Sequence, residues 1–272
     1  MKNKILYLFV LAILAIAGCK EKFDITLKNS YERLVVDGCL TDEAKRHTVK
    51  LSLTSNYFAN EPQPKATGAI VTLSDDSSIV TLTETSPGIY QTDSTYKGKI
   101  GKIYILDIIY NGEEYSASSL LKYVAPMDSI TFGPDPWEPE KRTINLWAME
   151  PATTGDYYQW LYYVNDTLKS DSIKNMNFAD DGMVNGNYMN GFPIFSWPAK
   201  PNDTVTLEMR SITKEYYTFI YNLYSEIFGS GSPFSGPPAN VKGNVKDLTN
   251  SEKDVMGFFI ASAVTRKTRI FK

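Results

Sequence analysis

The fold of this chain is decided by the stretch KIYILDIIYNGEEYSASSLL, residues 102–121, which holds two strand patterns joined by a two-residue turn. The first half is rich in β-branched and aromatic side chains, which favour strands. Asn111 and Gly112 both tolerate a positive φ, so the pair is typical of the tight turn of a β-hairpin. The middle of residues 102–110 is apolar on both faces of the pleat, which predicts a central strand of a sheet.

Short strand patterns separated by turn signals precede this hairpin, from Arg33 onward. In HTVKLSLT, residues 47–54, aliphatic and polar side chains alternate, which is typical of a half-buried strand. No helical period of useful length interrupts these strands. We therefore expect residues 31–125 to form an immunoglobulin-like or prealbumin-like β-sandwich of about seven strands.

A cluster of prolines after Ala125 marks a domain boundary. Four segments with strand patterns follow it, namely residues 143–150, 156–166, 192–197 and 203–212, and the first three contain aromatic residues. The end of the chain, VMGFFIASAVTRKTRIFK, predicts one or two further strands. The chain as a whole is therefore predicted to be mainly β, and residues 126–272 to form a second, β-rich domain.

One segment of this second domain has a helical period instead. In TKEYYTFIYNLYSEIFG, Tyr216, Ile220, Leu223 and Ile227 recur at the spacing of one helix face. The hydroxyl of Thr213 can cap the start of the helix, and a glycine follows its end. We expect one α-helix of about four turns over residues 213–228.

The N-terminal segment has the pattern of a lipoprotein signal peptide. Two lysines precede an apolar run, Ile5–Ala17, which is too short to span a bilayer. The run ends in Ala17-Gly18-Cys19, small residues before a cysteine, as in the bacterial lipobox. An ordinary cysteine that ends a secretory signal is the alternative. Lipidation of Cys19 would anchor the chain to a membrane, because several acyl chains hold far more strongly than one; residues 1–18 would be removed and residues 19–30 would form a charged tether.

Charge and cysteine content exclude some classes of protein. The formal net charge is −3, and nucleic-acid binders instead show a basic face, so we expect no nucleic-acid partner. The chain has two cysteines, and lipidation of Cys19 would leave Cys39 alone, without an intramolecular disulfide. A buried structural role is the usual one for such a free cysteine.

A search of the sequence for catalytic patterns gives negative results. The chain has one histidine, His47, and no G-x-S-x-G elbow for a serine nucleophile. Zinc needs three or four histidine or cysteine ligands, whereas the chain with a lipidated Cys19 would offer one histidine and one cysteine. The sequence therefore predicts no catalytic residue and no cofactor.

One acidic stretch leaves two alternatives open. Residues 175–187, NMNFADDGMVNGN, are rich in oxygen ligands, and Asp180 and Asp181 are its candidate calcium ligands. Because the spacing does not match an EF-hand loop, a solvated turn is the commoner structure for such residues. A pair of carboxylates is also what hydrolysis of a glycan needs, although such a pair has no local sequence signature.

Aromatic side chains are numerous, with 18 tyrosines, 13 phenylalanines and four tryptophans. Many are expected to line the sandwiches, because strands prefer aromatic residues. Some lie among proline, glycine and polar residues, where an exposed ring could contact a glycan, a peptide or a protein. These candidate contacts are Tyr57, Phe58, Trp137, Trp197 and Phe234.

Several segments in order resemble one known family. The lipobox is followed by LVVDGCLTDEAKRHTVKLSLTSNYF, ATGAIVTLSDD, PGIYQTD, GKIYILDIIYNGEEYSA, PPANVKGNV and VMGFFIASAV. This succession is similar to the domain-of-unknown-function 4249 lipoproteins of the Bacteroidota. The resemblance covers nearly the whole chain after Cys19; each motif is weak by itself, and their order carries the likeness.

The resemblance implies an outer-membrane lipoprotein, commonly encoded near TonB-dependent receptors, with no established catalytic residue. The short charged leader Lys20-Glu21-Lys22, although it has one acid, is similar to leaders that direct such lipoproteins to the cell surface. We therefore expect a non-enzymatic accessory module of a TonB-dependent nutrient transporter, with a glycan or peptide as a possible ligand. The alternative is a surface glycan or peptide hydrolase that uses carboxylates.

Overall fold

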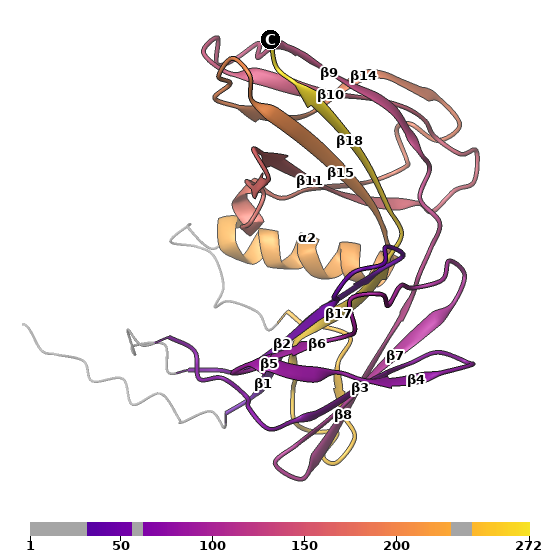
Figure 1. Cartoon of the computed structure of the whole chain (residues 1–272), viewed down its shortest axis with the longest axis vertical. Helices are drawn as coiled ribbons and strands as arrows, with labels where there is room; N and C mark the ends of the chain where they lie inside the picture. The colour runs from indigo at the N-terminus through magenta and orange to yellow at the C-terminus, as the bar shows by residue number, and fades with distance from the viewer. Residues whose placement is uncertain (1–31, 56–61, 230–240) are drawn as a thin grey trace, which may run out of the picture. The chain divides into compact units, whose positions relative to one another are not determined.

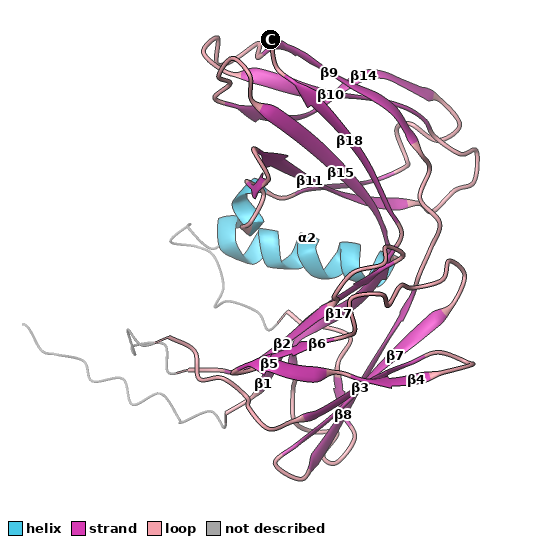
Figure 2. Ribbon diagram, in the orientation of Figure 1, coloured by secondary structure: helices cyan, strands magenta, loops and turns pink. Residues whose placement is uncertain are grey.

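The structure is a computed structural model that describes residues 32–55, 62–229 and 241–272. Strands predominate in the described residues, and they form four sheets accompanied by one α-helix and one short 3-10 helix (Figures 1 and 2). Among the residues that the structure describes, no helix has the length and apolarity needed to cross a membrane. The predicted mainly β class is confirmed.

Two five-stranded sheets pack face to face in the first sandwich. One has the order β17-β1-β2-β6-β5 and the other the order β16-β8-β7-β3-β4. The strands from the N-terminal half are β1 (Leu34–Thr41), β2 (Thr48–Leu53), β3 (Ile70–Ser74), β4 (Ile79–Thr81), β5 (Thr83–Ser86), β6 (Ile89–Gln91), β7 (Ile103–Tyr110) and β8 (Glu113–Leu120). Val36, Leu51, Leu106 and Ile108 meet in the core between the sheets.

The β-hairpin predicted over residues 102–121 is confirmed. β7 and β8 pair antiparallel from Ile103↔Leu120 to Tyr110↔Glu113. Asn111 and Gly112 between them have φ values of 51° and 79°, which the turn requires and which most other side chains resist. β7 lies between β8 and β3, as expected of a central strand.

The C-terminal part of the chain returns to this first sandwich. Strand β17 (Met256–Ser262) pairs parallel with β1, and β16 (Lys246–Asp247) pairs with β8. Figure 1 shows β17, in yellow, beside the indigo strand β1. This corrects the division into residues 31–125 and 126–272, because the first sandwich takes one strand in each sheet from beyond residue 240.

Two further sheets contain most of the second half, and together they form the second sandwich. One has the order β14-β10-β9 and the other the order β12-β11-β15-β18, with β13 also paired to β11. Their strands are β9 (Met127–Pro134), β10 (Arg142–Met149), β11 (Tyr157–Val164), β12 (Thr167–Leu168), β13 (Asn177–Asp180), β14 (Tyr188–Trp197), β15 (Thr204–Ile212) and β18 (Val264–Ile270). The short 3-10 helix η1 (Ile173–Asn175) precedes β13. The proline-rich stretch thus includes a strand, β9, and the turn that follows it.

The predicted helix is confirmed as α2 (Lys214–Gly229), the long coil in Figure 2. The hydroxyl of Thr213 accepts a hydrogen bond from the backbone N–H of Tyr216 at 3.2 Å, so it caps the helix as expected. The buried face of α2 centres on Ile220, which joins Ile212, Phe258 and Ile260 in a small second core. The helix therefore packs on both β15 and β17, from the two sandwiches.

His47, the one histidine, is held in its neutral form by backbone groups. It lies just before β2 and is 3% exposed. Its Nδ1 accepts a hydrogen bond from the N–H of Thr41 at 3.2 Å, so that nitrogen carries no proton. Its Nε2 lies 3.0 Å from the carbonyl oxygen of Tyr96 and 3.1 Å from that of Glu43, and therefore donates to them. Both ring nitrogens make hydrogen bonds to the backbone, which leaves neither for catalysis.

We expect the free energy of unfolding to decrease below about pH 6.5 because of His47. Burial, and then the positive charge of Lys45, lower the pKa of the imidazole from 6.5 despite the carbonyls of Tyr96 and Glu43. The imidazole then takes up a proton at higher pH in the unfolded chain than in the folded chain. The contribution of His47 to the free energy of unfolding is therefore complete above the pKa of the unfolded state, and it is lost as the pH falls through the pKa of the folded state. NMR can follow the single imidazole directly. Titration at or above 6.5, or the same pH dependence in a His47→Gln variant, would contradict the prediction.

Candidate functional site

Several of the sequence-predicted residues lie outside the described residues. They are the lipidation candidate Cys19 and the candidate contacts Tyr57, Phe58 and Phe234. Trp137 is described, and it lies in the turn between β9 and β10 with 89% of its surface exposed. The carboxylate of Asp135 accepts hydrogen bonds from the N–H groups of Trp137 and Glu138 at 2.8 and 2.9 Å, which fixes the turn. The structure thus presents the indole of Trp137 to solvent on an ordered turn.

Trp197 has the opposite environment. At the end of β14 it is 2% exposed, and its ring centroid lies 5.0 Å from that of Phe132 and 5.7 Å from that of Phe271. This corrects the expectation of a surface contact. The adjacent prolines and glycine suggested a loop, but Trp197 ends a strand and its ring fills the core of the second sandwich.

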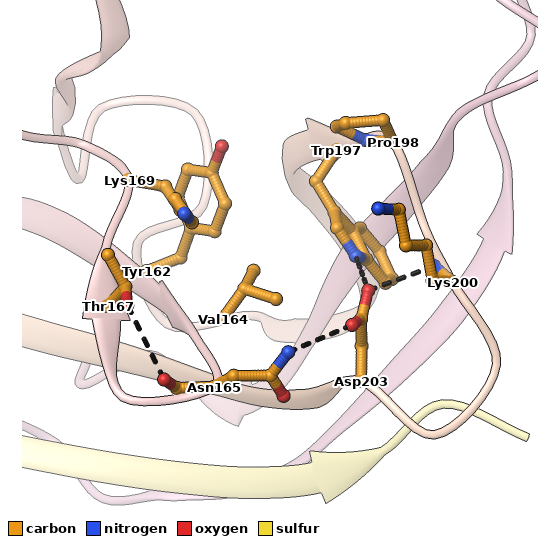
Figure 3. Close-up of a pocket in the computed structure, with 9 residues that line it drawn as sticks. All are labelled: Tyr162, Val164, Asn165, Thr167, Lys169, Trp197, Pro198, Lys200 and Asp203. Carbon is orange, nitrogen blue, oxygen red and sulfur yellow. Dashed lines mark hydrogen bonds between the residues drawn. The ribbon is translucent and has the colours of Figure 1, made fainter.

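A pocket of about 400 Å³ lies beside Trp197. Figure 3 shows Tyr162 and Lys169 on one side of it, and Trp197, Pro198 and Lys200 on the other. Two lysines and an aromatic ring are groups that can hold a small anionic or polar molecule. Sequence reasoning had singled out only Trp197 of these residues, because they come from different strands and loops.

The one carboxylate that lines this pocket, that of Asp203, has a structural role. Its Oδ2 accepts hydrogen bonds from the backbone N–H of Lys200 at 2.9 Å and from the indole of Trp197 at 3.4 Å. Its Oδ1 accepts from the side-chain amide of Asn165 at 3.1 Å (Figure 3). The backbone hydrogen bond of Lys200 is the main cause that holds the pKa of Asp203 below its usual value. An ionised carboxylate with both oxygens engaged is suited to fixing the loop rather than to moving protons.

The two candidate calcium ligands, Asp180 and Asp181, point to different environments. Asp180 is exposed and accepts a hydrogen bond from the N–H of Gly182, whereas Asp181 is buried. Carboxylate oxygens of Asp181, Glu150 and Asp156 lie within 4.8 Å of one another. The structure therefore keeps Asp181 as a candidate, replaces Asp180, and adds two acids that sequence reasoning missed. No local spacing could have found them, because Glu150 and Asp156 belong to a different turn.

The second half of α2 carries large side chains that face solvent. They are Tyr221, Tyr224, Ile227 and Phe228, of which Tyr221 is 54% and Phe228 46% exposed. The rings of Tyr224 and Phe228 lie 4.4 Å apart, and that of Tyr221 lies 6.4 Å from the ring of Tyr217. We call these four residues the aromatic face. The sequence pattern had placed Ile227 on one helix face with Ile220, and 43% of Ile227 is exposed although Ile220 is buried.

Comparisons with known proteins identify one family. The family model described as "Domain of unknown function (DUF4249)" matches residues 20–268. No curated protein matches the chain. Among solved structures, a cytokine receptor complex is 8% identical over 68% of this chain and 86% of that chain, with a TM-score of 0.23. A segment of two fibronectin type-III domains from chicken tenascin is 10% identical over 67% of this chain and 91% of that chain, with a TM-score of 0.21.

Proposed function

We propose that this chain, which belongs to the DUF4249 family, is a lipid-anchored outer-membrane binding module that docks on a TonB-dependent nutrient transporter. Two features support the proposal. The first is the signal peptide pattern that ends in Ala17-Gly18-Cys19 and provides a lipid anchor. The second is the aromatic face of α2, which is the observation that carries the docking step.

The aromatic face is unusual for a helix that packs on a sheet. Such a helix normally buries one apolar stripe and turns charged residues to solvent. In α2 the buried side is already provided by Ile220 with the residues around it, and large rings also project on the exposed side. Rings of this kind are enriched at the centres of protein interfaces, where they lose water on binding.

The partner that fits this surface best is a protein. The rings of the aromatic face are spread along one side of a helix, whereas a small ligand needs a concave site. A membrane anchor at Cys19 would hold the module on the same surface as a transporter, which raises the effective concentration of the two partners. The carboxylates of Asp203 and Glu150 give a hydrolase no comparable support, since both oxygens of Asp203 accept hydrogen bonds and Glu150 has no exposed surface.

The test uses the tagged full-length chain, purified from membranes of the cells that produce it. We expect a TonB-dependent receptor to co-purify with the wild type and to be lost with the double variant Tyr221→Ala, Phe228→Ala. Leu248→Ala, a truncation of an exposed residue away from α2, should retain the receptor. Because all three side chains are exposed, each variant should keep its free energy of unfolding within about 1 kcal/mol.

Cys19→Ser provides the control for the anchor. This variant should lose labelling by radioactive palmitate and leave the membrane fraction, and the receptor should then be recovered poorly even though the aromatic face is intact. Equal recovery of the receptor with the wild type and the double variant would contradict docking through α2. Palmitate labelling that persists in Cys19→Ser would contradict the anchor.

A further inference from the structure

Two turns of the second sandwich are joined around three carboxylates. Glu150 follows β10 directly and Asp156 precedes β11, while Asp181 follows β13. The backbone N–H of Asp181 donates to the carbonyl of Asp156 at 3.0 Å, and that of Glu150 donates to the carbonyl of Asn187 at 3.0 Å. Three strand ends from two sheets therefore meet at these acids.

Glu150 is the least expected member of this cluster, because its side chain is 0% exposed. Its Oε1 accepts a hydrogen bond from the hydroxyl of Tyr158 at 2.8 Å. Its Oε2 is buried and has no hydrogen-bond partner among the described residues. A buried carboxylate oxygen without a donor is costly and normally has a bound ion, a water molecule or a proton to explain it.

The other two acids have partial partners. Asp181 Oδ2 accepts from the N–H of Gly155 at 2.9 Å. Asp156 Oδ1 accepts from the amine of Lys122 at 3.1 Å, and its Oδ2 accepts from the hydroxyl of Thr153 at 2.9 Å. One lysine therefore faces three acids whose oxygens lie within 4.8 Å of one another, so negative charge is in excess when all three are ionised.

A fourth oxygen belongs to the same turn as Asp181. The backbone N–H of Asn185 donates to the carbonyl of Asp181 at 2.8 Å, which holds the two residues in one turn. The side-chain Oδ1 of Asn185 is also buried and has no partner among the described residues. A carbonyl oxygen of this kind is a common ligand of calcium beside carboxylates.

We infer that Glu150, Asp156 and Asp181, with the amide oxygen of Asn185, form a site for a calcium ion. All four groups are hard oxygen ligands, which favour calcium or magnesium over metals that prefer histidine or cysteine. Calcium is the better fit, because it accepts several carboxylate and amide oxygens of a protein in a flexible geometry, whereas magnesium keeps several of its water molecules. The ion would tie together the ends of β10, β11 and β13.

The rival explanation is that Glu150 holds a proton in place of an ion. Burial, and also the negative charges of Asp156 and Asp181, raise its pKa above the usual value, although the hydrogen bond from Tyr158 opposes this. The two explanations differ in one variant. The new side chain of Glu150→Gln resembles the protonated acid. If Glu150 holds a proton, this variant should have the calcium affinity of the wild type; if Glu150 binds calcium, the variant should bind it more weakly.

The experiment measures calcium binding to the full-length chain by calorimetry, and its effect on the melting temperature. We expect wild type and Asp180→Asn to bind calcium with a Kd between roughly 1 μM and 1 mM and to melt at a higher temperature with it. Glu150→Gln and Asp181→Asn should bind at least about 10-fold more weakly. Asp180→Asn is the matched control, because Asp180 is the neighbouring acid and lies outside the cluster.

Terbium, which replaces calcium and emits light when a nearby tyrosine is excited, gives a readout that does not depend on these variants. Because the hydroxyl of Tyr158 contacts Glu150, a bound terbium ion should emit strongly in the wild type and more weakly in Tyr158→Phe, and calcium should displace it. The absence of calcium-displaceable emission, or equal calcium affinity in wild type and Glu150→Gln, would overturn the site, whether or not a variant fails to fold.

Discussion

Gly257→Ala is expected to lower the free energy of unfolding by more than about 4 kcal/mol, a range reached only by changes that break a packed structure. Gly257 lies opposite Val36 in the parallel pairing of β17 with β1. Its φ is +91°, and a Cβ at this position would lie 1.9 Å from the carbonyl oxygen of Val36. Backbone atoms cannot swing aside as a side chain can, so β17 would have to leave β1. Urea unfolding followed by circular dichroism measures the loss.

Gly112→Ala is the matched control. Gly112 also has a positive φ, of +79°, but nothing lies within 4 Å of the position a Cβ would take. We expect this variant to lose only about 1–2 kcal/mol, the cost of placing an ordinary residue in the left-handed region. The difference between the two variants isolates the clash with β1. If both lose equal amounts, the pairing of β17 with β1 is not what stabilises the first sandwich.

Trp197→Ala should lower the free energy of unfolding by about 3–5 kcal/mol, the usual loss when a large buried aromatic residue is truncated. The indole packs against the rings of Phe132 and Phe271, so truncation leaves a cavity between them. It also removes the hydrogen bond that the indole N–H donates to Asp203. Trp137→Ala should change this free energy by about 0.5 kcal/mol at most, because the ring of Trp137 touches mainly solvent. Thermal unfolding of the two variants side by side gives the comparison.

Comparing the two variants distinguishes a tryptophan that packs in the core from one that is exposed at the surface. Equal, small effects of both variants would mean that Trp197 is not in the core, and the sequence-based expectation of a surface contact would return. A large effect of Trp137→Ala would mean that its turn is covered by another part of the protein. We expect a large effect at Trp197 and a small one at Trp137. The local sequence does not distinguish the two tryptophans, since both lie beside prolines.

Features that depend on neighbours in the sequence were predicted well. The β7–β8 hairpin follows from Asn111 and Gly112, because the φ preference of a residue acts on its own turn. The start of α2 follows from the hydroxyl of Thr213, which reaches only the first turn of the helix. The mainly β class follows in the same way from alternation within each strand. These signals are local, so they are present before any tertiary contact forms.

The exposure of a given face was predicted less well. The apolar character of both faces of β7 suggested burial on both sides, yet Ile103 is 58% exposed while Tyr104 and Leu106 are buried. In α2 the periodic pattern placed Ile227 on one helix face with Ile220, but Ile220 is buried whereas Ile227 belongs to the aromatic face. Apolar periodicity shows which side chains share a face, and the packing of other elements decides which face is covered.

The sequence by itself determined most of the longer strands, the hairpin, the helix and the candidate Asp181, because each depends on side chains that are close along the chain. Only the tertiary structure decided that β17 returns to β1, that Trp197 is buried, and that Glu150 and Asp156 join Asp181. The partners in these contacts are distant in sequence; β17, for example, lies more than 200 residues after β1. Which distant groups meet depends on how all the strands compete for partners and for burial, and no short stretch of sequence contains that information.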